Sequence, residues 1–125
     1  MTSQKPENRY KTAFRTRLKK RFGKDIWILP KHEMARHGTP DLLICLYGYF
    51  VAIEIKTDQD FAKKSPRDAL QVHELGLITT AGGLGLKMSP KHEALVFGFL
   101  GLLEGFPPLH GLQDLPPLGS LYINL

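Results

Sequence analysis

The sequence predicts an α/β domain in which a mixed β-sheet is flanked by helices. Short apolar runs with strand character alternate with longer segments of helical periodicity, in the order α-β-β-β-α-β-α. A chain of 125 residues with 42% hydrophobic and 23% charged side chains has the size and composition of one ordinary globular domain. We expect that domain to cover residues 1–104, and a tail rich in proline and glycine to cover residues 105–125.

An amphipathic helix is expected over residues 6–22, because apolar side chains recur at every fourth position. These side chains are Tyr10, Phe14, Leu18 and Phe22. Gly23 is a plausible end for the helix. Glu7 belongs to the same stripe at its N-terminal end, where it is either a partner of the helix dipole or a group directed into a site. The helix alone favours the first interpretation.

The other elements follow from apolar runs and their boundaries. We expect strands over residues 26–29, 41–46, 50–56 and 84–88, a helix that begins after Ser65 and ends near Thr80, and a helix from Ser89-Pro90 through Leu103. Ser65, Pro66 and Asp68 have the spacing of a capping box. The last helix is dense in Leu, Val and Phe, so burial is expected for it, and also for the thiol of Cys45 in its apolar run. In the tail, regular structure is expected only over residues 121–125.

Charge is distributed unevenly along the chain, whose net charge is +5. Residues 1–24 carry nine basic side chains and one acid, whereas residues 92–125 carry three acids and no Lys or Arg. This asymmetry favours a polyanionic partner about as well as it fits a solvated surface. No apolar run is long enough to span a membrane, and no secretory signal precedes the domain. With a single cysteine, these features indicate a cytoplasmic protein without a membrane partner.

Asp41, Glu54 and Lys56 form the pattern that carries chemistry. If the hairpin turns at Tyr47-Gly48, Asp41 stands directly opposite Glu54, with Cβ atoms roughly 5 Å apart. One oxygen of each carboxylate could then bind a shared cation at roughly 2.0–2.1 Å, the distance that Mg²⁺ prefers. Strand alternation places Lys56 on the same face as Glu54. A register shift of one residue would separate the two carboxylates, so the spacing is a geometric test that the sequence passes.

This arrangement suits the hydrolysis of phosphodiesters. A cation held by two carboxylates polarises a phosphate oxygen and lowers the pKa of a bound water, and a lysine stabilises the charge that develops on phosphorus. An isolated Glu-x-Lys is common by chance, as is Pro-Asp in turns. The joint condition of Pro40-Asp41, a short hairpin and Glu54-x-Lys56 in matching register favours a nuclease-type site.

The stretches 38–44 (GTPDLLI) and 50–56 (FVAIEIK), with a following helix that bears Gln71, resemble the PD-(D/E)XK nuclease superfamily, and within it the VRR-NUC group of virus-type replication-repair nucleases. The resemblance covers about residues 7–88. It implies a restriction-endonuclease-like core and Mg²⁺- or Mn²⁺-dependent hydrolysis of DNA in a bacterial or phage-infected cell. Free-standing members of the group resemble Holliday-junction resolvases and act as homodimers, so the resemblance also implies a branched DNA substrate and a second copy of the chain.

The resemblance also implies roles for individual residues. Asp41, Glu54 and the backbone carbonyl of Ile55 would bind metal, Lys56 would be the catalytic lysine, and Gln71 would approach the site from its helix. Glu7 would match an acid that faces the metal centre in the family, which reverses the preference stated above. The family has a serine three residues before the glutamine, where this chain has Asp68. A buried glutamine that only satisfies backbone groups is the alternative for Gln71.

Sequence-independent contacts to DNA phosphates are expected from basic residues on two segments: Arg9, Lys11, Arg15, Arg17, Lys19, Lys20 and Arg21 on the first helix, and Lys63, Lys64 and Arg67 after the catalytic strand. Simple solvation is as good an account of the second set. The five histidines show no ligand spacing. Two alternatives stay open: a nuclease for flaps, nicks or duplex DNA with the same site, and a non-catalytic DNA-binding module.

Overall fold

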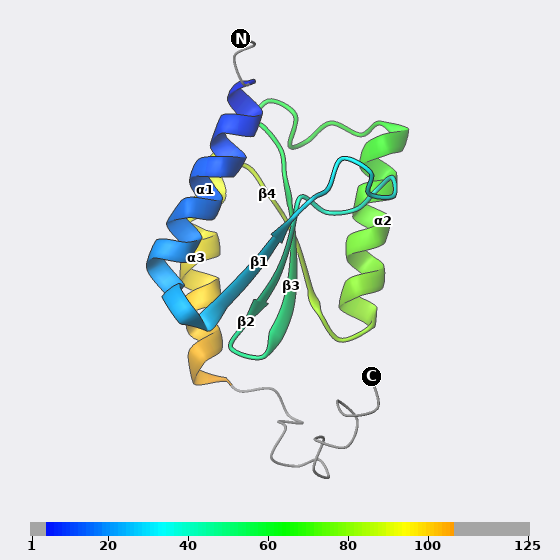
Figure 1. Cartoon of the computed structure of the whole chain (residues 1–125). Coiled ribbons are helices and arrows are strands. Elements are labelled where there is room, and N and C mark those ends of the chain that lie inside the picture. Colours follow the sequence, from blue (N-terminus) through cyan, green and yellow to red (C-terminus); the bar gives the residue numbers. More distant parts are fainter. Residues whose placement is uncertain (1–4, 107–125) are drawn as a thin grey trace.

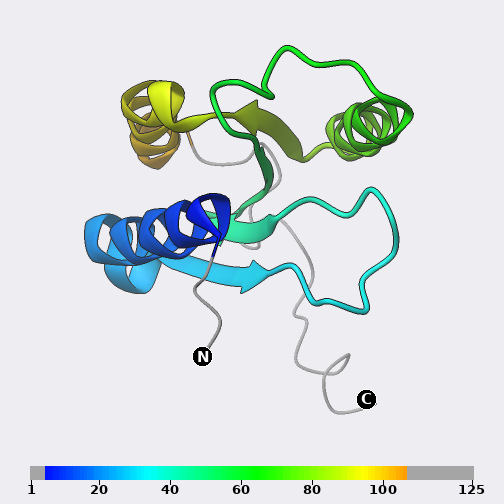
Figure 2. The ribbon, with the colours of Figure 1, turned by 90° about the horizontal axis from the view of Figure 1, so that it is seen from above.

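The structure is a computed structural model that describes residues 5–106 (Figure 1). A four-stranded sheet in the order β1-β2-β3-β4 forms its centre. The strands are β1 (Ile26–Pro30), β2 (Leu42–Leu46), β3 (Tyr49–Ile55) and β4 (Leu84–Met88). The helices are α1 (Pro6–Phe22), α2 (Pro66–Thr80) and α3 (Glu93–Leu102), with 3-10 turns at Gly23–Asp25, Pro90–His92 and Leu103–Gly105. Viewed from above, α1 and α3 cover one face of the sheet and α2 lies against the other (Figure 2).

Strand pairing makes the sheet mixed, as the sequence predicts. β1 pairs with β2 and β2 with β3 in antiparallel fashion, whereas β3 and β4 are parallel. In the hairpin, Leu42 lies opposite Ile53 and Leu46 lies opposite Tyr49, which confirms the predicted register. Tyr47 and Gly48 have φ angles of 53° and 86°. Two successive positive φ values characterise the tight turns whose twist matches that of paired strands.

The main core lies between the sheet and the two helices α1 and α3. The predicted stripe of α1 is confirmed, because Phe14, Leu18 and Phe22 are buried. They pack in one cluster with the alternate strand residues that face the same way, and the cluster includes Ile53 and Ile55. This face of β3 therefore anchors the strand, and the opposite face is left to carry polar groups.

Helix α2 begins with the predicted capping box. The Ser65 hydroxyl accepts a hydrogen bond from the Asp68 backbone N–H at 3.1 Å, and the Asp68 carboxylate accepts one from the Ser65 N–H at 2.9 Å. The helix approaches β4 closely at Gly85, where an added Cβ would lie 2.6 Å from the backbone oxygen of Leu75. This close approach fixes the helix above β3 and β4 and leaves the β1–β2 half of the same face uncovered.

Two expectations about burial are wrong. Cys45 is exposed, because its side chain belongs to the uncovered half of the sheet, beside Trp27 on β1 and Phe50 on β3. Helix α3 is buried on one side only: Val96 and Leu100 contact the core, whereas Leu95 is 75% exposed. This helix carries more apolar side chains than can be buried against the core, and the remainder face outwards.

Element boundaries differ little from the predicted ones. β2 begins one residue after the predicted Asp41 and β3 ends one residue before the predicted Lys56, so these two side chains lie just outside the strand ends. No helix among residues 5–106 is long and apolar enough to cross a membrane. The regular structure expected over 121–125, with most of the tail, lies outside the described residues.

Candidate active site

The candidate site lies on the face of the sheet that α2 partly covers, at the end where β3 stops. The ladder continues beyond β2, because the N–H of Lys31 donates to the carbonyl of Asp41 at 2.8 Å. Extension of the observed registers places four side chains in one row across the sheet: Lys31, Asp41, Glu54 and Lys87. The two carboxylates at the centre of this row are the pair that the hairpin spacing predicts, and both are buried.

The Asp41 carboxylate is held by two groups. Its Oδ2 accepts a hydrogen bond from the Ile55 backbone N–H at 2.8 Å, which links the end of β2 to the end of β3. Its Oδ1 accepts from the Lys11 ammonium of α1 at 3.0 Å. These two contacts fix the position of the carboxylate between the strand ends and α1.

Glu54 lies in the opposite situation, because it is only 3% exposed and its Oε2 has no hydrogen-bond partner in the described part of the chain. Burial first, and then the neighbouring Asp41 carboxylate, raise the pKa of Glu54 to about 8 against the opposing charges of Lys56 and Lys31. The rise in the pKa of Glu54 that burial and the second carboxylate cause is thus larger than the decrease that the charges of two nearby lysines cause. A further cation would reverse this balance.

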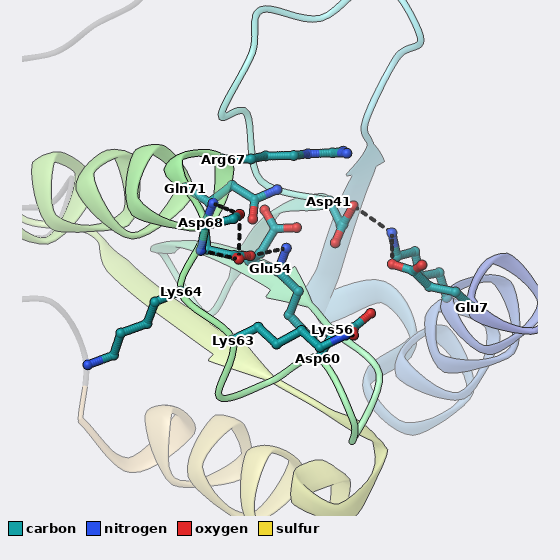
Figure 3. Close-up of a pocket in the computed structure, with 12 residues that line it drawn as sticks. Glu7, Asp41, Glu54, Lys56, Asp60, Lys63, Lys64, Arg67, Asp68 and Gln71 are labelled. Atoms are coloured by element: carbon teal, nitrogen blue, oxygen red, sulfur yellow. Dashed lines mark hydrogen bonds and ion pairs between the residues drawn. The ribbon is translucent and has the colours of Figure 1, made fainter.

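Lys56 contacts a residue that sequence reasoning did not assign to the site. Its ammonium forms an ion pair with Asp68 Oδ1 at 3.0 Å, and both side chains are nearly nine-tenths buried. The other oxygen of Asp68 is the capping group of α2, so one carboxylate joins the helix start to the lysine. Hydrogen bonds from Ser65, followed by the charge of Lys56, hold the pKa of Asp68 well below its usual range. Figure 3 shows Lys56 between Glu54 and Asp68.

Gln71 points into the same pocket from α2, as the resemblance implies (Figure 3). It is buried, and its Oε1 has no hydrogen-bond partner among the described residues. The alternative in which Gln71 only satisfies backbone groups therefore lacks a partner for this oxygen. Glu54 and Gln71, each with one buried oxygen that lacks a partner among the described residues, line a pocket of about 610 Å³ together with Asp41 and Lys56.

Glu7 reaches the rim of this pocket through Lys11, whose ammonium lies 3.2 Å from Glu7 Oε1. The structure therefore directs Glu7 towards the site. It does not gather Glu7, Asp41 and Glu54 into one cluster, since residues 5–106 contain no group of three or more His, Cys, Asp and Glu side chains placed to hold a metal ion.

The basic residues expected to contact DNA fall into three groups. Lys11, Lys63, Lys64 and Arg67 line the pocket. Arg9, Arg15, Lys19, Lys20 and Arg21 lie along α1. Arg17 differs, because it is engaged with α3 through an ion pair with Glu93 at 2.6 Å.

Sequence reasoning also missed Lys31, which the β1–β2 ladder places beside Asp41. β1 and β2 pair in one continuous antiparallel register, and extending that register places Lys31 opposite Asp41. The loop between these strands is too long for its length alone to fix that register, in contrast to the tight hairpin.

A mixed sheet flanked by helices, with two carboxylates and a lysine at one sheet end, is the arrangement of an α/β nuclease-like fold. A search of solved structures finds the same fold in a chain described as a VRR_NUC domain, with a TM-score of 0.52 and 23% sequence identity, over 70% of this chain and 94% of that chain. The fold expected from the motif resemblance is thereby confirmed. No family model matches the sequence. No curated protein matches it either.

Proposed function

We propose that this chain is a divalent-metal-dependent endonuclease that hydrolyses phosphodiester bonds in DNA. The observation that carries the proposal is the paired burial of Asp41 and Glu54 at one sheet end, with Lys56 beside them. Two adjacent carboxylates destabilise each other unless a cation or a proton is present, and the lysine is suited to bind an anionic substrate. The shared fold of a VRR_NUC domain agrees with this function.

The residues present fit a divalent cation. Glu54 Oε2 and Gln71 Oε1 are buried oxygens without a partner, and Asp41 Oδ1 already contacts a cation, the Lys11 ammonium. Oxygen donors of this kind are those that Mg²⁺ and Mn²⁺ prefer. Asp41, Glu54 and the carbonyl of Ile55 would hold the ion, with Glu7 as a more distant acid. When bound, the ion would supply Lewis-acid polarisation of a phosphate oxygen and a more acidic water.

The protein's own side chains would do the rest. Lys56, fixed by Asp68, would place a positive charge against the phosphate oxygens as negative charge develops on them. Lys11, whose ammonium lies 3.0 Å from Asp41 Oδ1, would supply a further positive charge to the substrate backbone. Basic residues of α1 and of the segment before α2 would supply further phosphate contacts.

We propose further that the enzyme acts as a homodimer on branched DNA, as a Holliday-junction resolvase does. Two symmetric sites would cut two strands at matching positions. The uncovered half of the sheet supports a second copy as its occupant, because apart from Lys31 at its end the exposed side chains are apolar and uncharged in a chain of net charge +5. Trp27, Leu29 and Phe50 are 61%, 48% and 47% exposed there. Exposed apolar patches of this kind mark interaction surfaces.

Cleavage of labelled DNA tests the function. Wild-type protein with Mg²⁺ or Mn²⁺ is incubated with a four-way junction, a flap and a linear duplex. Lys56→Ala should abolish cleavage and leave salt-sensitive DNA binding, whereas Lys24→Ala, an exposed lysine at the far end of α1, should cut normally. Normal cutting by Lys56→Ala would refute the site. Equal cutting of all three substrates would refute the junction preference and leave the nuclease.

The dimer has its own test, since Trp27 is the single tryptophan and Cys45 the single cysteine, and they are direct partners across β1 and β2. In a dimer through this face, dilution below the dissociation constant should shift the Trp27 emission to the red and speed the reaction of Cys45 with a thiol reagent. Trp27→Glu should be monomeric in sedimentation, and Leu95→Glu on the exposed side of α3 is the control. A Trp27→Glu protein that remains dimeric would exclude this face.

A further inference from the structure

A second hollow, of about 440 Å³, adjoins the catalytic pocket on the side of β1. The two hollows share Lys11, Asp41 and Arg67, so they form one continuous depression. Their linings differ in charge. The catalytic pocket is lined by five carboxylates and five basic side chains, whereas the second hollow has two carboxylates, Asp41 and Glu33, against the basic side chains Lys11, Arg15, Lys31 and Arg67 and the imidazole of His32.

Lys31 is the best-placed of these cations. The ladder between β1 and β2 puts it directly opposite Asp41, on the same face of the sheet, one step from the catalytic carboxylates. Its charge acts on the site, because it is one of the two lysines that oppose the rise in the pKa of Glu54. Lys31 also lines the second hollow, which adjoins the catalytic pocket.

Three of the four lysine and arginine side chains in the second hollow also lack counter-ions. Among residues 5–106, the site lysines Lys11 and Lys56 are ion-paired, whereas no ion pair involves Arg15, Lys31 or Arg67. Arg15 comes from α1, Lys31 follows β1 and Arg67 belongs to the first turn of α2, so three separate elements direct positive charge to one hollow. In Figure 3 the Arg67 side chain extends over the pocket towards the side of Asp41. Unpaired cations that converge on a hollow form an anion site.

We propose that this hollow binds the DNA phosphate next to the scissile one, with Lys31 as its central contact and Arg15 and Arg67 on either side. The inference rests on the proposed function, because it takes the catalytic pocket as the place of the scissile phosphate. A phosphodiester strand carries its charges at regular intervals, so a strand with one phosphate at the carboxylate pair needs a positive subsite for the next. The hollow provides that subsite on the β1 side.

The test combines substitutions in the protein with neutral phosphates in the DNA. Binding is measured in EDTA, so that no cleavage occurs, on substrates in which one methylphosphonate replaces one phosphate at each position around the mapped cut. Wild-type protein should lose several-fold affinity when the phosphate next to the cut is neutral. Lys31→Ala should lose similar affinity for unmodified DNA and be insensitive to neutralisation at that position. Lys31→Arg should restore the wild-type pattern.

Lys24→Ala is the matched control, an exposed lysine that lies outside both hollows. It should keep the wild-type pattern at every position. The salt dependence gives a second readout, since the loss of one phosphate contact should reduce the slope of log K against log salt by about 0.7–0.9 for Lys31→Ala. Thermal unfolding of each variant verifies that it is folded.

Three outcomes would overturn the inference. Lys31→Ala could bind as Lys24→Ala does, or it could weaken binding equally at every phosphate position, which would indicate a diffuse field and no subsite. In both cases cleavage by wild-type protein and its loss in Lys56→Ala would leave the proposed function standing. If wild-type protein neither binds nor cuts DNA, both the subsite and the function are refuted.

Discussion

Glu54→Gln should make the metal-free protein more stable at neutral and alkaline pH, although it should abolish activity. The side chain is 3% exposed and lies beside Asp41, and its pKa rises from 4.5 to about 8. A carboxyl group whose pKa is raised by folding binds its proton more tightly in the folded state. Its ionisation therefore lowers the free energy of unfolding as the pH rises from about 4.5 to about 8.

The magnitude follows from the two pKa values. One pKa unit corresponds to about 1.4 kcal/mol, so the difference between 4.5 and about 8 amounts to about 5 kcal/mol once the pH exceeds 8. At pH 7 the same relation gives about 3 kcal/mol. Glutamine stays neutral at every pH and has almost the same shape, and its amide can donate to Asp41 or to the orphaned oxygen of Gln71. The effect is large, since a domain of this size is stable by only about 5–15 kcal/mol.

Urea unfolding in EDTA at pH 5, 7 and 8.5, followed by far-UV circular dichroism, measures the difference. The free energy of unfolding of the wild type should fall relative to that of Glu54→Gln as the pH rises, with the two close at pH 5. Glu7→Gln is the control, because it removes a half-buried carboxylate from the rim of the same pocket and leaves the buried pair intact. Its difference from the wild type should not grow with pH.

Added Mg²⁺ or Mn²⁺ should then raise the stability of the wild type much more than that of Glu54→Gln, because a ligand that binds only the folded state stabilises it by mass action. The reasoning fails if wild-type protein and Glu54→Gln are equally stable at pH 8.5 in EDTA. It fails equally if the difference is independent of pH.

Two further predictions use matched pairs of variants. Asp68→Asn should lower turnover by about 10–100-fold, because Lys56 loses the ion pair that positions its charge for the transition state. Ser65→Ala should instead lower the free energy of unfolding by about 1 kcal/mol through the loss of a helix cap and leave turnover unchanged. Steady-state kinetics and urea unfolding of both variants measure these effects, and reversed effects would contradict the assignment. Gly85→Ala, on β4, should destabilise the fold by about 1–3 kcal/mol because its Cβ would collide with the backbone of α2. Gly76→Ala, within α2 and with open space around it, should stabilise the fold by up to about 1 kcal/mol. Thermal unfolding that gave the same sign for both variants would refute this account of the packing.

The carboxylate pair could be predicted from the sequence because a local rule fixes it. A tight hairpin sets its register by its turn, so the positions of Asp41 and Glu54 follow from the turn alone. The start of α2 was equally predictable, since its capping box requires only neighbouring residues. Local spacing is sufficient in both cases.

Features that depend on how elements pack could not be predicted in this way. Cys45 lies in an apolar run, and such a run does not reveal that α2 covers only the β3–β4 half of its sheet face. The ion pair between Lys56 and Asp68 joins two elements across a polar loop, and Lys31 enters the site through the pairing of β1, an edge strand. Each requires a tertiary register that no short pattern contains.

The row of side chains across the sheet accounts for two properties expected of the site: a lower stability of the metal-free protein and an affinity for a divalent ion. The register of the paired strands holds Asp41 and Glu54 side by side on one face of the sheet. Lys31 and Lys87 lie at the two ends of the row. Lys87 donates to the Phe61 carbonyl at 2.7 Å and stays at the edge, so the central pair receives too little positive charge from the protein itself. The raised pKa of Glu54 reflects this shortage of positive charge, because the effect of burial exceeds that of the nearby lysines.

A divalent ion would compensate two adjacent carboxylates better than a lysine can, since it carries twice the charge of a lysine. The same uncompensated carboxylates that lower the stability of the free protein are therefore what would draw a metal ion into the site.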